Sequence, residues 1–260
     1  MKHVFMIILS LYIFHSAFSQ DDNPPMVTDR PDRTESAVTV PKKTFQIESG
    51  FNFGWGKNEG VSTKELGFNG TLFRYGIADR FEARVGVAYA GVDKENEITE
   101  EKTSLSGFVP LVIGFKWNFI HGDGPIPTMA LLSHIDLPFA ASKDFDDGNV
   151  LHNIIFSGSW YLSKVFSFGF NFGSRIDWKQ SDFTTVYTTA LGISIAKWLG
   201  TFVELYGFLP AGEYSDHRFN MGFTFPVRNN LQFDVSGGMG ISKNSPDGFA
   251  SFGFAWRIPR

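Results

Sequence analysis

The serine and histidine residues do not have the spacing of a hydrolytic site. A nucleophilic serine needs a base within hydrogen-bond reach of its hydroxyl. Ser133 and His134 are adjacent, so their side chains point to opposite faces of an extended strand. His152 has no hydroxyl-bearing residue two positions away on either side. The pattern predicts no catalytic triad, and we expect a protein without enzymatic activity.

Metal and cofactor sites have little support in the sequence. His134 and Asp136 share one face of an extended segment, but two ligands are too few for a metal site. The chain contains no cysteine, which excludes thiolate ligands and disulfides. The glycine-rich run at residues 237–240 lies inside an alternating segment, whereas a phosphate-binding loop lies between a strand and a helix. We expect no metal and no cofactor.

A compact group of charges stands near the N-terminal end. Asp29, Arg30, Asp32 and Arg33 surround Pro31. Proline fixes its own φ and restricts the residue before it, so this segment should be extended and not helical. The guanidinium fork of arginine can hold a carboxylate through two hydrogen bonds. What these charges can bind depends on the secondary-structure elements that carry their partner charges.

From residue 44 onward the chain alternates large apolar residues with small or polar ones, in segments of ten or so residues. In residues 166–178 the apolar set is Phe166, Phe168, Phe170, Phe172, Ile176 and Trp178, and the other set is Ser167, Gly169, Asn171, Gly173, Arg175 and Asp177. Period two separates the faces of a strand, whereas a helix would scatter both sets. Twelve such segments begin near Thr44, Thr63, Arg80, Thr103, Ile126, Asn149, Val165, Phe183, Thr201, Asp216, Asn230 and Gly248.

The connections between these segments alternate in length. Short connections include Ile77-Ala78-Asp79 and Leu199-Gly200, whereas residues 93–102 and 142–148 form longer, acidic connections. Bacterial outer-membrane barrels pair short periplasmic turns with longer external loops in this way. The turn at residues 121–125 is the exception, because it is long but stands where the alternation calls for a short connection.

Strand length and the composition of the second face favour a membrane barrel over a soluble sandwich. Soluble strands typically have about five or six residues, whereas a tilted membrane strand needs about nine to eleven. A solvated outer face rich in Gly and Ser and poor in charge would be unusual. Aromatic residues facing lipid and small polar residues facing a lumen fit better. We predict an all-β, antiparallel transmembrane β-barrel of about twelve strands after a short extended N-terminal segment.

The small and polar parity should then line the lumen. It includes Glu48, Glu82, Arg84, Lys116, His134, Asp136, Arg175, Asp177, Glu204, Asp234 and Arg257. Charges of both signs favour networks of salt bridges, whereas a ring of one sign would select ions. A selective solute path stays open as the second interpretation, because twelve strands lie between filled eight-strand and open sixteen-strand barrels.

The first residues and the overall charge define the compartment and the domains. Lys2, an apolar run from Val4 to Phe14 and the small-x-small pattern Ala17-Phe18-Ser19 predict a signal peptide over residues 1–19. Residues 20–43 would form the extended segment and residues 44–260 the barrel. The formal charge of −4 argues against a nucleic-acid partner.

Two interpretations of the charged N-terminal segment stay open. It could be a plug or gate that enters the periplasmic mouth and pairs with lumen charges such as Arg84 and Asp234. It could also be a solvated leader or an assembly tag. For the plug, Asp29, Arg30, Asp32 and Arg33 are the candidate gate residues.

Several stretches carry a family resemblance. They are residues 28–36 (TDRPDRTES) with 40–50 (VPKKTFQIESG), residues 74–84 (RYGIADRFEAR), residues 202–207 (FVELYG) and residues 230–238 (NLQFDVSGG). The chain resembles a bacterial outer-membrane transporter family whose label refers to the meta-cleavage pathway of phenol degradation. The resemblance covers nearly all of the mature chain and implies an outer-membrane transport barrel without enzymatic activity.

We therefore expect a passive channel for small solutes, hydrophobic or aromatic ones included, in the outer membrane of a Gram-negative bacterium. Its partners would be outer-membrane lipid, the barrel-assembly machinery and a small-molecule solute, with no nucleic acid. The alternative is a structural or surface-interaction barrel with a closed lumen and no transport.

Overall fold

The computed structural model describes residues 24–258. The predicted signal peptide, residues 1–19, lies outside the described residues. Within residues 24–258 no helix is long and apolar enough to cross a membrane.

Thirteen strands and two short 3-10 helices make up the described chain. They are β1 (Phe45–Asn58), β2 (Val61–Ala78), β3 (Phe81–Asn96), β4 (Lys102–Phe108), β5 (Leu111–Ile120), β6 (Thr128–Leu137), η1 (Pro138–Ala140), η2 (Lys143–Phe145), β7 (Leu151–Tyr161), β8 (Phe166–Asp177), β9 (Asp182–Ala196), β10 (Leu199–Pro210), β11 (Asp216–Arg228), β12 (Leu231–Gly240) and β13 (Gly248–Arg257).

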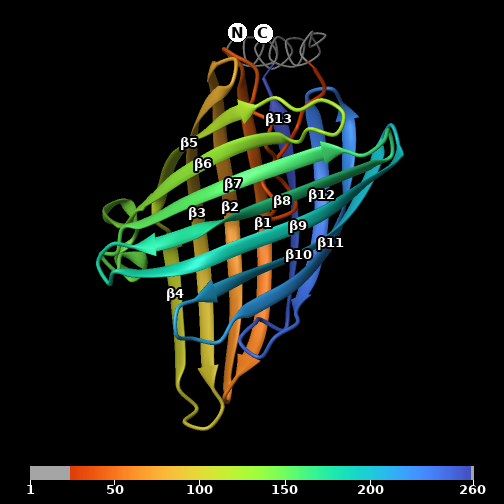
Figure 1. Cartoon of the computed structure of the whole chain (residues 1–260). Coiled ribbons are helices and arrows are strands. Elements are labelled where there is room, and N and C mark those ends of the chain that lie inside the picture. Colours follow the sequence, from red (N-terminus) through yellow and green to blue (C-terminus); the bar gives the residue numbers. More distant parts are fainter. Residues whose placement is uncertain (1–23, 259–260) are drawn as a thin grey trace, which may run out of the picture.

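Twelve of these strands form a closed antiparallel ring (Figure 1). The first and last strands pair from Gln46 opposite Arg257 to Trp55 opposite Gly248, and β2 pairs with β3 to complete the ring. β4 and β5 pair with successive parts of β3. Pro110 separates them, because proline has no N–H to donate to a ladder. β4 and β5 thus act as one interrupted strand, and the predicted barrel of about twelve strands is confirmed.

The two faces of the strands have opposite chemistry. Large apolar side chains are exposed on the outer face, with Phe172 and Phe252 each 58% exposed. Polar and charged side chains on the inner face are buried, as Glu48 and Glu204 illustrate. A soluble barrel would have the reverse arrangement. The outer surface is therefore suited to lipid and the inner one to a polar lumen.

β2 contains an extra residue that changes which of its side chains face the lumen. Gly50 of β1 lies opposite Gly70, but Asn52 lies opposite Gly67. Such a bulge reverses the alternation along the strand. Arg74 faces inward on one side of the bulge, and Glu65 faces inward on the other side.

The two ends of the barrel differ. The end where β1 begins and β13 ends has mostly short turns and is called the turn end here; the opposite end is called the loop end. The short turn expected at Leu199-Gly200 lies at residues 197–198, because both residues belong to β10. The loop expected over residues 93–102 is reduced to residues 97–101, because β3 and β4 continue pairing toward its tip in the hairpin at the bottom of Figure 1.

Candidate functional site

Residues 24–43, called the plug here, run inside the ring of strands (Figure 1). At the turn end the Arg257 guanidinium donates to the carbonyl of Pro24 at 2.7 Å. Deeper in the lumen, Ala37 is fully buried and packs with Ala130 and Leu132 of β6. Lys42 then forms a parallel bridge to Gly76 before β1 begins. The plug thus enters and leaves the lumen at the turn end.

The central contact of the plug is Asp29. Its carboxylate lies 2.7 Å from the Arg84 guanidinium, 2.9 Å from Lys116 Nζ and 3.2 Å from the Arg74 guanidinium. Burial by itself would raise the pKa of Asp29, but these three cations outweigh burial and hold its pKa below the ordinary range. Asp29 is therefore ionised and surrounded by positive charge.

The barrel wall supplies only part of the balancing charge for these cations. Glu82 lies 2.9 Å from Arg74 and 3.0 Å from Arg84, and Glu48 lies 2.7 Å from Arg74. The wall thus offers three cations and two carboxylates at this level, and the plug adds two more carboxylates, Asp29 and Glu35, the latter 2.5 Å from the Arg84 guanidinium. A buried charge without a partner is costly, so the seated plug completes the network.

The same wall carboxylates also hold the plug backbone. Glu48 accepts a hydrogen bond from the Asp29 amide at 2.9 Å, and Glu82 accepts one from the Val40 amide at 2.7 Å. Each carboxylate therefore binds both a wall cation and a plug N–H group.

Arg30 makes a second contact on β12 and β13, the strands that follow β1 around the ring. Its guanidinium donates to Asp234 of β12 at 2.8 and 3.3 Å and to the Ser251 hydroxyl of β13 at 3.1 Å. The guanidinium also lies directly over Gly50 and Gly253. A Cβ atom at either glycine would come within 2.5 Å of it. Glycine at both positions therefore makes room for Arg30.

Glu204 of β10 forms a third contact, which has only neutral donors. Its carboxylate accepts from the Arg33 amide at 2.9 and 3.1 Å, from the Thr34 hydroxyl at 2.7 Å and from Asn220 Nδ2 at 3.0 Å.

Burial raises the pKa of Asp32 well above its ordinary value, and the neighbouring charge of Glu204 raises it further. The Arg33 side chain makes no hydrogen bond or ion pair with the residues that the structure describes.

Polar side chains around the ring bind further carbonyl groups of the plug backbone. Irregular chain at membrane depth needs such partners, because lipid offers none. The carbonyl acceptors and their donors are Val27 with Gln46, Glu35 with Ser157 and Asn171, Ala37 with Asn118, and Val38 with Arg74.

The remaining candidate residues lie on the inner face without a hydrogen bond to the plug. His134 is buried, and its Nε2 atom has no partner in the described part of the chain. Asp136 lies near the loop end, where Arg175 donates to Asn153 Oδ1 at 3.2 Å. No group of three histidine or carboxylate side chains among residues 24–258 is placed to hold a metal ion.

One serine and histidine pair does form, on the outer face. The Ser133 hydroxyl lies 2.8 Å from His152 Nε2, because β6 and β7 place the two residues on neighbouring strands. The two residues are 19 positions apart in the sequence, so local spacing did not indicate the pair. No described residue hydrogen-bonds the other ring nitrogen of His152, and the adjacent backbone belongs to the sheet ladder. The pair therefore lacks both an orienting group and an oxyanion hole.

Two important inner residues were not among the sequence candidates. Arg74, fully buried, contacts Asp29, Glu48 and Glu82. The alternation of residues 73–77 carries the signal for it, since Phe73, Tyr75 and Ile77 take the outer parity. Glu65 carries no such signal, because the bulge in β2 cannot be read from the alternation.

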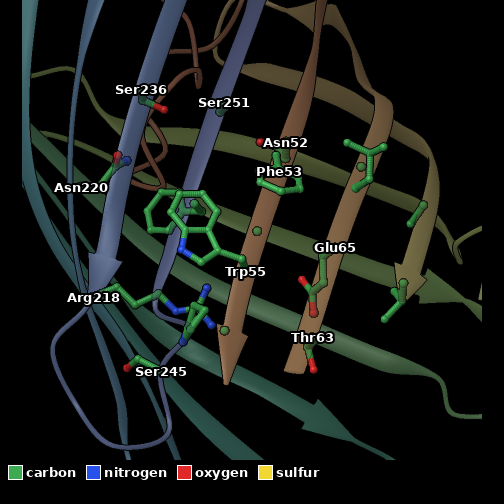
Figure 2. A pocket seen from close by; sticks show the side chains of 18 of the residues that line it. Asn52, Phe53, Trp55, Thr63, Glu65, Arg218, Asn220, Ser236, Ser245 and Ser251 are labelled. Carbon is green, nitrogen blue, oxygen red and sulfur yellow. The ribbon is translucent and has the colours of Figure 1, made fainter. Parts of the chain in front are cut away.

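Cavities lie on either side of the plug. The outer cavity, of about 440 Å³, opens toward the loop end and is lined by Asn52, Glu65, Arg218 and Asn220 from the wall, among others (Figure 2). The inner cavity, of about 760 Å³, lies at the turn end between the plug and wall residues such as Arg80 and His121. The two have no lining residue in common.

Residues 31–34 of the plug separate the outer cavity from a smaller one. Pro31 and Arg33 line the outer cavity, whereas Asp32 and Thr34 line a side cavity of about 160 Å³ against β7 to β10. The side cavity and the inner cavity both contact Val38. This four-residue stretch, anchored on Glu204, therefore lies between the outer cavity and the side cavity and is called the partition here.

Solved structures share this fold. The COG4313 outer membrane channel from Pseudomonas putida F1 aligns with a TM-score of 0.61 at 9% identity, over 89% of this chain and 100% of that chain. The transport unit of the autotransporter AIDA-I from Escherichia coli gives 0.53 at 9% identity, over 86% and 92%. The KdgM porin in complex with disordered oligogalacturonate gives 0.51 at 11% identity, over 81% and 98%. At these identities the likeness concerns the fold.

Sequence comparison assigns the family. No curated protein matches the chain. The family described as "Putative MetA-pathway of phenol degradation" matches residues 28–258, which include both the plug and the whole ring of strands. The chain therefore belongs to this family.

Proposed function

We propose that the protein is a passive outer-membrane channel for small solutes, and that the plug is its gate. The observation that carries the proposal is the partition at residues 31–34. It lies between the outer cavity and the side cavity, and hydrogen bonds of this stretch together with the ion pair of the adjacent Arg30 hold it in the lumen. Such contacts can be broken and remade.

The apolar outer face and the fold support the outer membrane as its location. In bacterial outer-membrane barrels short turns face the periplasm, so the turn end would be periplasmic and the outer cavity would face the exterior. The first nineteen residues would direct export as a signal peptide. Outer-membrane lipid and the barrel-assembly machinery would then be its partners, and no enzymatic step is part of the proposal.

Hydrophobic and aromatic solutes are included among those proposed. The family description refers to phenol degradation. The outer cavity also has an aromatic wall, where Tyr206 and Phe249 pack edge to face with ring centres 6.4 Å apart. Their rings offer an apolar contact beside the polar groups of the wall.

Deletion of residues 21–36 tests the gate. The shortened protein should assemble, because every ladder of the ring lies outside the deletion, and its conductance in planar bilayers should exceed that of the parent. Liposome swelling should show faster entry of small solutes. A deletion variant that assembles and stays sealed would favour the alternative of a closed structural barrel. Unchanged conductance and solute selectivity in an already open parent would make the segment a leader.

A further inference from the structure

The outer cavity contains two opposite charges that the barrel leaves without partners. Arg33 is the exposed residue within the otherwise buried or half-buried stretch 26–41, and it forms part of the cavity lining. Glu65, on the wall strand β2, lines the same cavity (Figure 2). Within the described residues neither the Arg33 guanidinium nor the Glu65 carboxylate makes a hydrogen bond or ion pair.

The other charged residues of this cavity are compensated. Arg218 is paired with Asp216 and lies over the rings of Tyr206 and Phe208, 5.9 and 5.6 Å from their centres. Lys57 is paired with Glu97. What the cavity offers to a solute is therefore one positive and one negative group, held apart from each other.

A buried acceptor lies beside Arg33. The Arg33 amide and Asn220 Nδ2 both donate to Glu204, which brings the two residues together. Asn220 is only 1% exposed, and its Oδ1 atom has no partner in the described part of the chain. Buried acceptors are normally hydrogen-bonded. A ligand N–H that donated to this oxygen would therefore remove the free-energy cost of leaving it without a hydrogen bond.

We propose that the outer cavity binds a small zwitterion with an apolar group, of the amino-acid type. The solute carboxylate pairs with Arg33, whose fork suits a carboxylate. The ammonium group pairs with Glu65 and has Asn220 as a further acceptor. The apolar group lies against Phe249, which packs on Tyr206. A volume of about 440 Å³ is within the range of small-ligand pockets.

This inference rests on the proposed function only for the side from which the solute arrives. Arg33 belongs to the gate partition, so a bound solute touches the plug itself. Binding to the purified full-length barrel in detergent needs no transport, which keeps the two proposals separable.

Titration calorimetry with L-phenylalanine tests the site. Saturable binding is expected, and phenylacetate and 2-phenylethylamine, which each lack one charge, should bind at least about tenfold more weakly. Arg33→Gln and Glu65→Gln should each weaken L-phenylalanine binding by about tenfold or more. The matched controls are Lys102→Gln and Glu95→Gln, which remove an exposed ion pair of the β3–β4 hairpin and should bind like the parent.

Several outcomes would overturn the proposal. These are no saturable binding, equal binding of phenylacetate, or unchanged affinity in both cavity variants. If these appear while deletion of residues 21–36 still raises conductance, the site is wrong and the channel stands. If binding is found and the deletion variant stays sealed, the site stands and the channel is wrong.

Discussion

Asp29 connects the plug to three cations of the wall, and this makes it the most sensitive single position. Asp29→Asn keeps the size of the side chain but removes a negative charge that contacts Arg74, Arg84 and Lys116. Breaking one partner out of a buried charge network costs about 3 to 5 kcal/mol. The seated plug should lose stability by that order, and planar-bilayer conductance should rise.

Asp136→Asn is the matched control for Asp29→Asn. It also neutralises an inner-face carboxylate, but Asp136 makes no hydrogen bond or ion pair with the described residues of the plug and lies near the loop end. Its conductance should equal that of the parent. A parent-like trace from Asp29→Asn would show that the charge network does not hold the plug.

The position of Asp32 makes seating of the plug dependent on pH. Its pKa is raised by burial and by Glu204, with Asp29 and Glu48 adding to the effect, so the seated plug binds more protons than the free segment. Stability from this group is therefore present at low pH and lost as the pH rises through the raised pKa. Conductance should increase in a titration from about pH 5 to about pH 9.

Asp32→Asn isolates this effect. The amide stays neutral, so the variant should keep the low conductance over the same titration. If the conductance of the variant rises with pH as that of the parent does, another group is responsible for the pH dependence.

The inward residues could largely be read from the sequence, and Arg84 and Asp234, expected as partners of a plug, do pair with it. The full set of pairs could not be read. Period two places Glu82, Arg84 and Glu204 on the lumen parity without knowledge of the fold. Which of them meets Asp29 depends on strand tilt and on the path of the plug, and neither leaves a local pattern. Glu65 was missed for a different reason, because one extra residue in β2 reverses its face.

At the scale of elements, neighbouring positions of β1 separate lipid from lumen. Phe51 is 39% exposed on the outer face and stacks on Phe252 with ring centres 5.0 Å apart. Asn52 lines the outer cavity. An arginine on the lipid face at mid-bilayer costs about 2 to 4 kcal/mol, whereas a lumen arginine stays hydrated. Phe51→Arg should reduce the yield of assembled barrel, and Asn52→Arg should not.

Heat-modifiable migration on gels measures this yield. Equal yields of the two variants would contradict the assignment of inner and outer faces. Asn171, also on the inner face, is unsuitable as the tolerant position, because its amide group holds the backbone of Glu35.

The strands themselves were largely predictable. The twelve segments expected from alternation begin within about two residues of the strands of the ring, since period-two patterns are strong over segments of this length. The turn at residues 197–198 and the division at Pro110 were not resolved. Alternation continues through a short turn, and a proline between two stretches on one partner strand does not disturb it.

At the scale of the whole molecule, a covalent bond can hold the plug in place. The Thr34 and Thr188 hydroxyls are 2.7 Å apart, and the chain contains no cysteine to form other disulfides. The double variant Thr34→Cys/Thr188→Cys should form a bond that fixes the partition against β9. Its conductance should fall below that of the parent and recover when a reductant is added.

The single variants Thr34→Cys and Thr188→Cys are the controls and should not respond to reductant. If the oxidised double variant conducts as well as its reduced form, solutes pass the seated plug and the partition is not the gate.

The plug precedes in the sequence all the strands that hold it, and this separates assembly into two steps. Arg30 binds Asp234, which follows it by 204 residues, and Pro24 binds Arg257, which follows it by 233 residues. Neither contact can form before the later residue is in place. The pocket for the plug exists only once β13 has paired with β1. Insertion therefore precedes seating, and a newly inserted barrel passes through an unplugged intermediate. In a pulse-labelled population, the N-terminal segment should gain protection from protease later than the ring gains resistance to heat.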